Sequence, residues 1–118
     1  MSDAAALFKV QGVLLVAIRD DIDDGDIVDL QEELSEAVAS EDVDGVIIDI
    51  SALEIVDTFV GRVLGQLARI AHLLSSSTYV VGMRPAVAMT LVELGMTLPE
   101  MRTALDVDQA LRRIQAAK

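Results

Sequence analysis

Short apolar runs alternate along this chain with longer segments of helical periodicity, and this alternation limits the folds that it can adopt. The segment from Gly45 to Ile50 is a continuous β-branched run between turn residues, which is typical of a strand buried on both faces. Further strands are predicted at residues 7–10, 13–18 and 78–82, and Gly12 indicates a hairpin between the first two. Buried strands separated by helices predict a mostly parallel sheet with helices packed on it.

The segments between the strands have apolar residues at helical spacing. Ile27, Leu30 and Leu34 begin one such face, and the Asp residues before it can cap the helix start. A second helix is predicted at residues 59–74, a third opens at Pro85 and stops at Gly95, and a fourth covers residues 106–115. The order β-β-α-β-α-β-α-(short β)-α predicts an α/β fold in a single domain over residues 1–118.

Composition and charge narrow the classes of partner. The chain is 53% hydrophobic with a mean hydropathy of +0.48, which is typical of a compact folded domain. Its formal net charge of −11 argues against nucleic acid and anionic membranes, because phosphate groups attract Lys and Arg. The favoured partner is therefore a protein with a complementary basic surface. The chain has no Cys, which removes disulfides and thiol catalysis.

The amino terminus has no export signal, because residues 1–6 contain an acidic residue and no basic one. No stretch reaches the roughly 18 uncharged apolar residues that a membrane span requires. We therefore expect a cytoplasmic protein. Only these six residues precede the first predicted strand, which leaves no room for a sensory domain before it.

The most informative loop runs from Ser51 to the segment Asp57-Thr58-Phe59, where the second helix begins. Parallel sheets place functional groups in loops of this kind, at the carboxyl ends of strands. A side-chain oxygen of Asp57 or Thr58 can cap the helix. The Thr58 hydroxyl is also a candidate substrate for a protein kinase, because a helix start tolerates the charge of about −1.5 to −2 that phosphate adds. The two interpretations are compatible.

Other candidate sites are weaker. The acidic run before the first helix could suggest a calcium-binding EF-hand loop. When Gly25 is aligned with the invariant Gly of such a loop, however, Ile22 and Gln31 fall at ligand positions. A solvated loop with a helix cap is therefore the preferred interpretation. His72 is the single histidine, and without Cys it does not predict a zinc site. No nucleophile, base and orienting group occur together, so an enzyme or a ligand carrier is the least favoured alternative. We expect no catalytic residue, cofactor or metal.

Two stretches of the sequence resemble the STAS domain family (sulfate transporter and anti-sigma factor antagonist), and the resemblance covers essentially the whole chain. The first combines residues 47–51 with the segment from Val56 to Gly65; the second runs from Gly82 to Gly95 and is followed by Ala104-Leu105-Asp106. Together with Asp57-Thr58-Phe59, this second stretch is more narrowly similar to RsbS-type scaffolds of the stressosome, and the run from Gly82 to Gly95 is the most specific part of that similarity. The resemblance implies a mixed, mostly parallel sheet of four to five strands and about four helices, with the main helices in a single layer on one face.

The resemblance also implies a function without catalysis. Scaffolds of this type sequester an RsbT-type serine/threonine switch kinase, co-assemble with RsbR-type sensor STAS proteins and release the kinase when phosphorylated. The family's acceptor hydroxyl maps onto Thr58, where RsbS-type scaffolds typically have Ser. We expect the kinase to dock around this acceptor, at Asp57, Phe59, Arg62 and Arg84. A simple anti-sigma factor antagonist regulated at Thr58 is the alternative within the family, and a homodimer is a further expectation.

Overall fold

A computed structural model describes residues 5–19, 21–40, 43–54, 58–73, 77–93 and 102–117. Within these ranges, the strands are β1 (Ala5–Val10), β2 (Val13–Ile18), β3 (Gly45–Asp49), β4 (Ser77–Val81) and β5 (Arg102–Ala104). The helices are α1 (Asp24–Ser40), α2 (Thr58–Leu73), α3 (Pro85–Glu93) and α4 (Val107–Ala116). The predicted element order is confirmed, and Gly95, the predicted end of the third helix, lies outside the described residues.

The strands form one sheet in the order β1-β2-β3-β4-β5. β1 pairs with β2 in an antiparallel manner, and every other neighbouring pair is parallel. Gln11 and Gly12 form the two-residue turn of the hairpin, with φ values of 52° and 80°. Two consecutive positive φ values are the mark of the turn whose twist matches paired strands. The predicted hairpin and the mostly parallel sheet are both confirmed.

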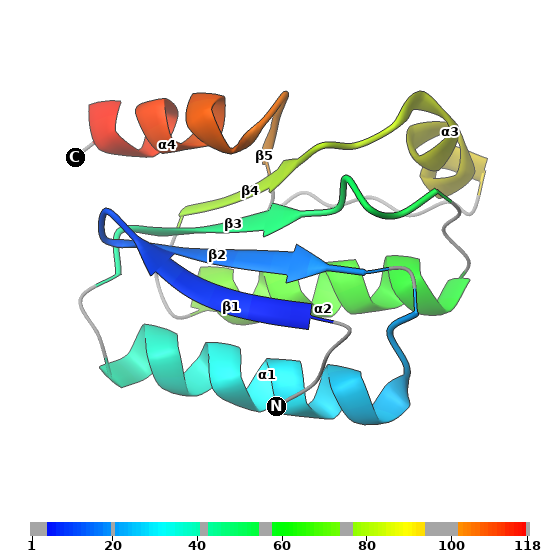
Figure 1. The fold of residues 1–118 in the computed structure, drawn as a ribbon, viewed down its shortest axis with the longest axis horizontal. Helices are drawn as coiled ribbons and strands as arrows, with labels where there is room; N and C mark the ends of the chain where they lie inside the picture. Colours follow the sequence, from blue (N-terminus) through cyan, green and yellow to red (C-terminus); the bar gives the residue numbers. More distant parts are fainter. Residues whose placement is uncertain are drawn as a thin grey trace.

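Two helices, α1 and α2, pack on one face of the sheet. Residues that alternate along the central strands point to this face and form its core: Leu14, Val16, Ile18, Val46, Ile48 and Val80. Side chains of α1 and α2 complete this core, and Val87 and Leu91 of α3 join it. Figure 1 shows α1 and α2 side by side beneath the sheet. The predicted single layer of main helices is therefore confirmed.

The fourth helix lies on the opposite face. Ala110 and Ile114 of α4 pack against Ile47, Tyr79 and Val81, which are the other set of alternating strand residues. β3 is therefore buried on both faces, as its β-branched sequence predicts. α4 contacts β3, β4 and β5, so it covers the half of this face that is remote from β1 (Figure 1).

Hydrogen bonds at the start of α1 explain the acidic run before it. The backbone N–H of Asp26 donates to Oδ1 of Asp23 at 2.9 Å, and the N–H of Asp23 donates to Oδ2 of Asp26 at 3.1 Å. This reciprocal pair satisfies two helix-terminal donors at once. The acidic run therefore caps the helix, as preferred from the sequence. Asp20, which the EF-hand alignment would need, lies outside the described residues.

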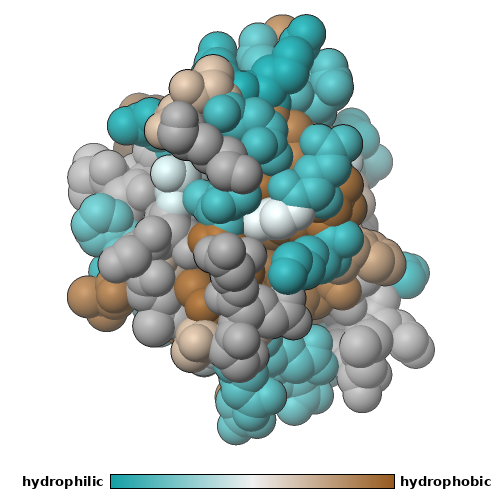
Figure 2. All heavy atoms as spheres, turned by 90° about the vertical axis from the view of Figure 1, so that its left-hand side faces the viewer, coloured by the Kyte–Doolittle hydropathy of each residue, from teal (hydrophilic) through white to brown (hydrophobic). Residues whose placement is uncertain are grey.

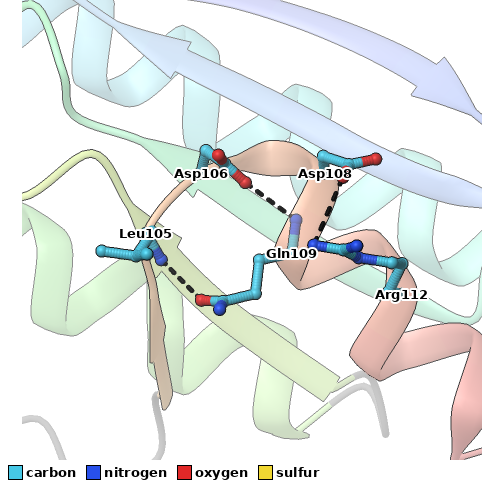
Figure 3. A network of polar contacts seen from close by, with 5 residues as sticks. All are labelled: Leu105, Asp106, Asp108, Gln109 and Arg112. Atoms are coloured by element: carbon cyan, nitrogen blue, oxygen red, sulfur yellow. Dashed lines mark hydrogen bonds and ion pairs between the residues drawn. The ribbon is translucent and has the colours of Figure 1, made fainter.

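The start of α4 is capped in a similar way (Figure 3). Oδ1 of Asp106 accepts from the N–H of Gln109 at 2.9 Å, and Oε1 of Gln109 accepts from the N–H of Leu105 at 2.8 Å. Because the cap satisfies a backbone donor, we expect Asp106→Ala to lower the free energy of unfolding by about 1 kcal/mol. Asp108→Ala is the matched control, since its ion pair with Arg112 is exposed and worth about 0.5 kcal/mol or less. Urea unfolding of both variants measures the difference; equal losses would contradict the role of the cap.

The two neighbouring helices of the lower layer carry opposite charges. α1 contains six acidic residues and no Lys or Arg. α2 contains no acidic residue and carries Arg62, Arg69 and His72. Gln31 of α1 donates from Nε2 to Oε1 of Gln66 in α2 at 2.7 Å, which ties the two helices together at mid-length. The helical layer is therefore acidic on one side and basic on the other.

Candidate functional site

The loop after β3 begins with a tight turn that the strand itself stabilises. Oδ1 of Asp49 accepts from the N–H of Ser51 at 2.9 Å, and the N–H of Ile50 donates to the carbonyl of Val81 in β4 at 3.1 Å. Leu53 is fully buried, so its side chain anchors the loop in the core. Ser51 itself is exposed. The loop thus leaves the sheet at a fixed position on the carboxyl edge, where the sequence places it.

Gly82, directly after β4, allows this loop to approach closely. Its φ is +74°, a backbone conformation that L side chains rarely adopt. A Cβ atom at this position would lie 2.7 Å from Cβ of Ser51 and 3.0 Å from its backbone nitrogen. The ends of β3 and β4 can therefore meet only with Gly at this position. Gly82 donates its N–H to the carbonyl of Leu105, which joins the end of β5 to the same edge.

Arg84 connects the loop to the start of α3. Its Nε donates to the carbonyl of Ser51 at 3.2 Å, and its own carbonyl accepts the N–H of Ala88. Pro85 is the first residue of α3, as predicted, at a position that needs no N–H. Arg84 therefore fixes the loop while part of its side chain remains exposed. The sequence predicted a surface role for Arg84 but not this contact.

Thr58, the predicted acceptor, is exposed and is the first residue of α2. Asp57, the other residue predicted to cap this helix, lies outside the described residues. The first turn of α2 contains no acidic residue, so no carboxylate of that turn opposes an added anion. Figure 1 shows the start of α2 at the same end of the molecule as α3 and the loop after β3.

The remaining predicted docking residues divide into two groups. Arg62 is exposed one helical turn after Thr58, and Arg84 is exposed at the start of α3. Arg62 is the only Lys or Arg between Arg19 and Arg69, so it is the cation nearest to Thr58 in the sequence. Phe59 belongs to α2 by its backbone, and its side chain lies outside the part that the structure describes, as does Asp57.

The edge also holds a shallow cavity of about 390 Å³ between the loop and the start of α4, lined by Asp49, Ser51, Gly82 and Asp106 among others. Among the described residues, no group of three or more His, Cys, Asp or Glu side chains could hold a metal ion. His72 is exposed in the last turn of α2. No helix in the described ranges is long and apolar enough to cross a membrane.

Several known proteins are similar to this chain over most of its length. The family model described as STAS domain matches residues 5–110. A variant of Moorella thermoacetica RsbS in which Glu replaces a Ser is 38% identical, with a TM-score of 0.84 over 96% of each chain.

A chain from a structure described as the molecular architecture of the stressosome, a signal integration and transduction hub, is also 38% identical, with a TM-score of 0.85 over 95% of this chain and 97% of that one. The unphosphorylated anti-sigma factor antagonist SpoIIAA is 22% identical, with a TM-score of 0.72 over 96% of this chain and 97% of that one, and shares the fold.

Proposed function

This chain belongs to the STAS domain family, and on that premise we propose that it is a cytoplasmic, non-enzymatic stressosome scaffold, which sequesters an RsbT-type switch kinase and releases it on phosphorylation at Thr58. The observation that carries the proposal is that Thr58, the first residue of α2, is exposed. The proposal is supported by the similarity of this chain to RsbS and to a chain of the stressosome structure, each 38% identical over almost its whole length.

The proposed switch is electrostatic. Before phosphorylation, Arg62, one helical turn after the acceptor, and Arg84, at the start of α3, present exposed cations to acidic groups of the kinase. A phosphate on Thr58 adds a charge of about −1.5 to −2. Arg62 lies four residues later on the same helix, a spacing at which side chains of a helix meet. The phosphate therefore competes with the kinase for Arg62 and repels acidic groups that docked there.

Helix α2 is suited to carry this charge without unfolding. Its amino-terminal N–H groups and dipole stabilise an anion at the first turn. The described part of the loop after β3 is anchored by the buried Leu53, and Arg84 ties this part of the loop to the start of α3. Phosphorylation should therefore change the surface and leave the backbone in place, so that the protein remains part of its assembly while the kinase departs.

The size of the complex that this chain forms with its proposed partners tests the proposal. We expect gel filtration with an RsbR-type sensor STAS protein and an RsbT-type kinase to give a very large particle that contains all three proteins. Addition of ATP should release the kinase and leave the particle intact. The control is the same mixture with a non-hydrolysable ATP analogue, in which the kinase should stay bound.

A different outcome would identify the alternative within the family. A simple anti-sigma factor antagonist would bind its kinase in a small complex and form no large particle with a sensor STAS protein. A large particle that never retains the kinase would contradict sequestration and leave only the role in assembly.

A further inference from the structure

A solvent-exposed groove runs between α1 and α2 in the helical layer, and we call it the α1–α2 groove. Its volume is about 500 Å³, and residues of both helices line it: Val28, Gln31, Glu32, Ser35, Glu36 and Ile70. Figure 1 shows the two helices side by side beneath the sheet. The side-chain hydrogen bond from Gln31 to Gln66 joins them at this point. The two walls of the groove are therefore held at a fixed separation.

Apolar side chains lie in and beside this groove. Val28 lines it from α1 and is 53% exposed. Ile70 lines it from α2 and is only partly buried, since its other side packs against the core. Residues three or four apart share a helix face, so Leu73, which is 81% exposed, continues the face of α2 that bears Gln66 and Ile70. Apolar surface therefore follows the sides of α1 and α2 that face each other.

The two walls of the groove carry opposite charges. Glu32 is exposed and lines the α1 wall together with Glu36. On α2, Arg62 and Arg69 are exposed and lie one helical turn before and after Gln66. An occupant of the groove must therefore present cations toward α1 and anions toward α2.

We propose that the α1–α2 groove binds an amphipathic helix of a partner protein. The apolar stripe of that helix packs on Val28 and Ile70. Lys or Arg residues along one edge of the stripe meet Glu32, and Asp or Glu residues along the other edge meet Arg69. Helices bound in grooves are anchored in this way, by side chains at positions i, i+3, i+4 and i+7.

The dimensions of the groove suit a helix. Val28 and Glu36 are eight residues apart on α1, which corresponds to about 12 Å of helix axis, or roughly two turns. An extended strand would gain no main-chain hydrogen bonds here, because the groove has no sheet edge. Figure 2 views the molecule from the end at which α1 and α2 finish, and hydrophilic side chains project at the bottom of this view, where the helical layer lies. The occupant therefore needs charged edges as well as an apolar stripe.

A second copy of this chain does not supply such a helix from the residues that the structure describes. α3 exposes Met89 and Val92 but contains no Lys or Arg, and α1 contains none either. α2 and α4 already bury their apolar faces in the two cores, where Leu67 and Ile114 are examples. The chemistry of the groove thus favours a different protein as the partner.

A designed peptide tests the groove. The probe is a fluorescein-labelled peptide of five helical turns, about 18 residues, with Leu at helical spacing. Lys along one edge and an equal number of Glu along the other give it no net charge, so the acidity of the domain does not attract it. Fluorescence anisotropy should show binding to the wild-type chain about tenfold or more tighter than that of a scrambled peptide of the same composition. Equal affinity for the two peptides would overturn the proposal.

Loss of the apolar contact should weaken this binding. We expect Val28→Asn to raise the dissociation constant of the amphipathic peptide several-fold. Val92→Asn is the matched control, because Val92 is 77% exposed and lies on α3. It should bind the peptide as the wild type does, and circular dichroism should show both variants folded. Equal affinities of the two variants would contradict binding in the groove.

Reversal of one charge tests the orientation of the edges. Glu32→Lys should weaken binding of the amphipathic peptide about tenfold. Asp29→Lys changes the net charge equally, and Asp29 is exposed on α1 but is not among the residues that line the groove. A second peptide with Glu along both edges should bind Glu32→Lys more tightly than Asp29→Lys. If this second peptide bound both variants equally, the pairing with Glu32 would be refuted.

Sedimentation of the chain without peptide identifies a second copy as the occupant. The wild type and Val28→Asn should sediment alike at every concentration. Dissociation of an oligomer by Val28→Asn would assign the groove to self-association and overturn the proposal. These experiments involve neither a kinase nor ATP, so their results are independent of the switching role proposed for Thr58.

Discussion

Incubation with an RsbT-type kinase and ATP should add one phosphate to this protein, and Thr58→Ala should take up none. Thr58 is exposed at the start of α2 and carries a hydroxyl, whereas the variant has no acceptor there. Because it cannot acquire the charge that displaces the kinase, Thr58→Ala should remain bound in ATP while the wild type is released. Intact mass spectrometry measures the phosphate, and co-sedimentation with the kinase measures the release.

Three variants control this experiment. Thr58→Ser should restore labelling, since the hydroxyl is retained. Thr90→Ala should label normally, because the Thr90 hydroxyl on α3 donates to the carbonyl of Ala86 and is not the proposed acceptor. Thr58→Asp should weaken kinase binding only in part, since a carboxylate carries one charge and phosphate about −1.5 to −2. Labelling that persists in Thr58→Ala, or disappears in Thr90→Ala, would refute the assignment.

Gly82→Ala should lower the free energy of unfolding by about 2 kcal/mol or more. The left-handed backbone costs an L residue about 1–2 kcal/mol, and the added methyl group must also displace Ser51, whose Cβ would be 2.7 Å away. The loop that leads toward α2 should then shift, so kinase binding should weaken together with stability. Urea unfolding and a titration with the kinase measure the two effects.

Gly25→Ala is the matched control for this substitution. Gly25 lies in α1 without a positive φ, and an added Cβ would meet Asp23 Oδ1 at an ordinary 3.5 Å. Ala has the higher helix propensity, so this variant should match the wild type or exceed it by up to about 1 kcal/mol. Wild-type stability in Gly82→Ala would show that the close approach of β3 and β4 is not required.

The strands and helices could be predicted because their signals are local. The β-branched run of β3 and the helical spacing in α1, α2 and α4 place each element within a few residues of its observed bounds. β5 was expected only as an unplaced short strand, since the three residues Arg102–Ala104 are too few to show a period. The face of the sheet on which α4 packs could not be predicted, because β3 is apolar on both faces.

The contacts of the candidate site were harder to predict. Thr58 could be placed at a helix start from spacing alone. The approach of Gly82 to Ser51, and the bond from Arg84 to the Ser51 carbonyl, join residues more than thirty positions apart. Glycine and arginine after a strand are common in turns, so nothing in the local sequence distinguishes these tertiary roles. They depend on which strands are neighbours and in what register.

The unlike charges of α1 and α2 give the domain an electric dipole across its helical layer. In the field of an approaching protein, such a molecule turns before any atoms touch, so that its cationic helix meets an anionic region. Since α2 also bears Thr58, the same rotation turns the acceptor toward the partner before the two proteins touch. Encounter rates should consequently decrease as salt screens the dipole, even where the affinity of the final complex changes little.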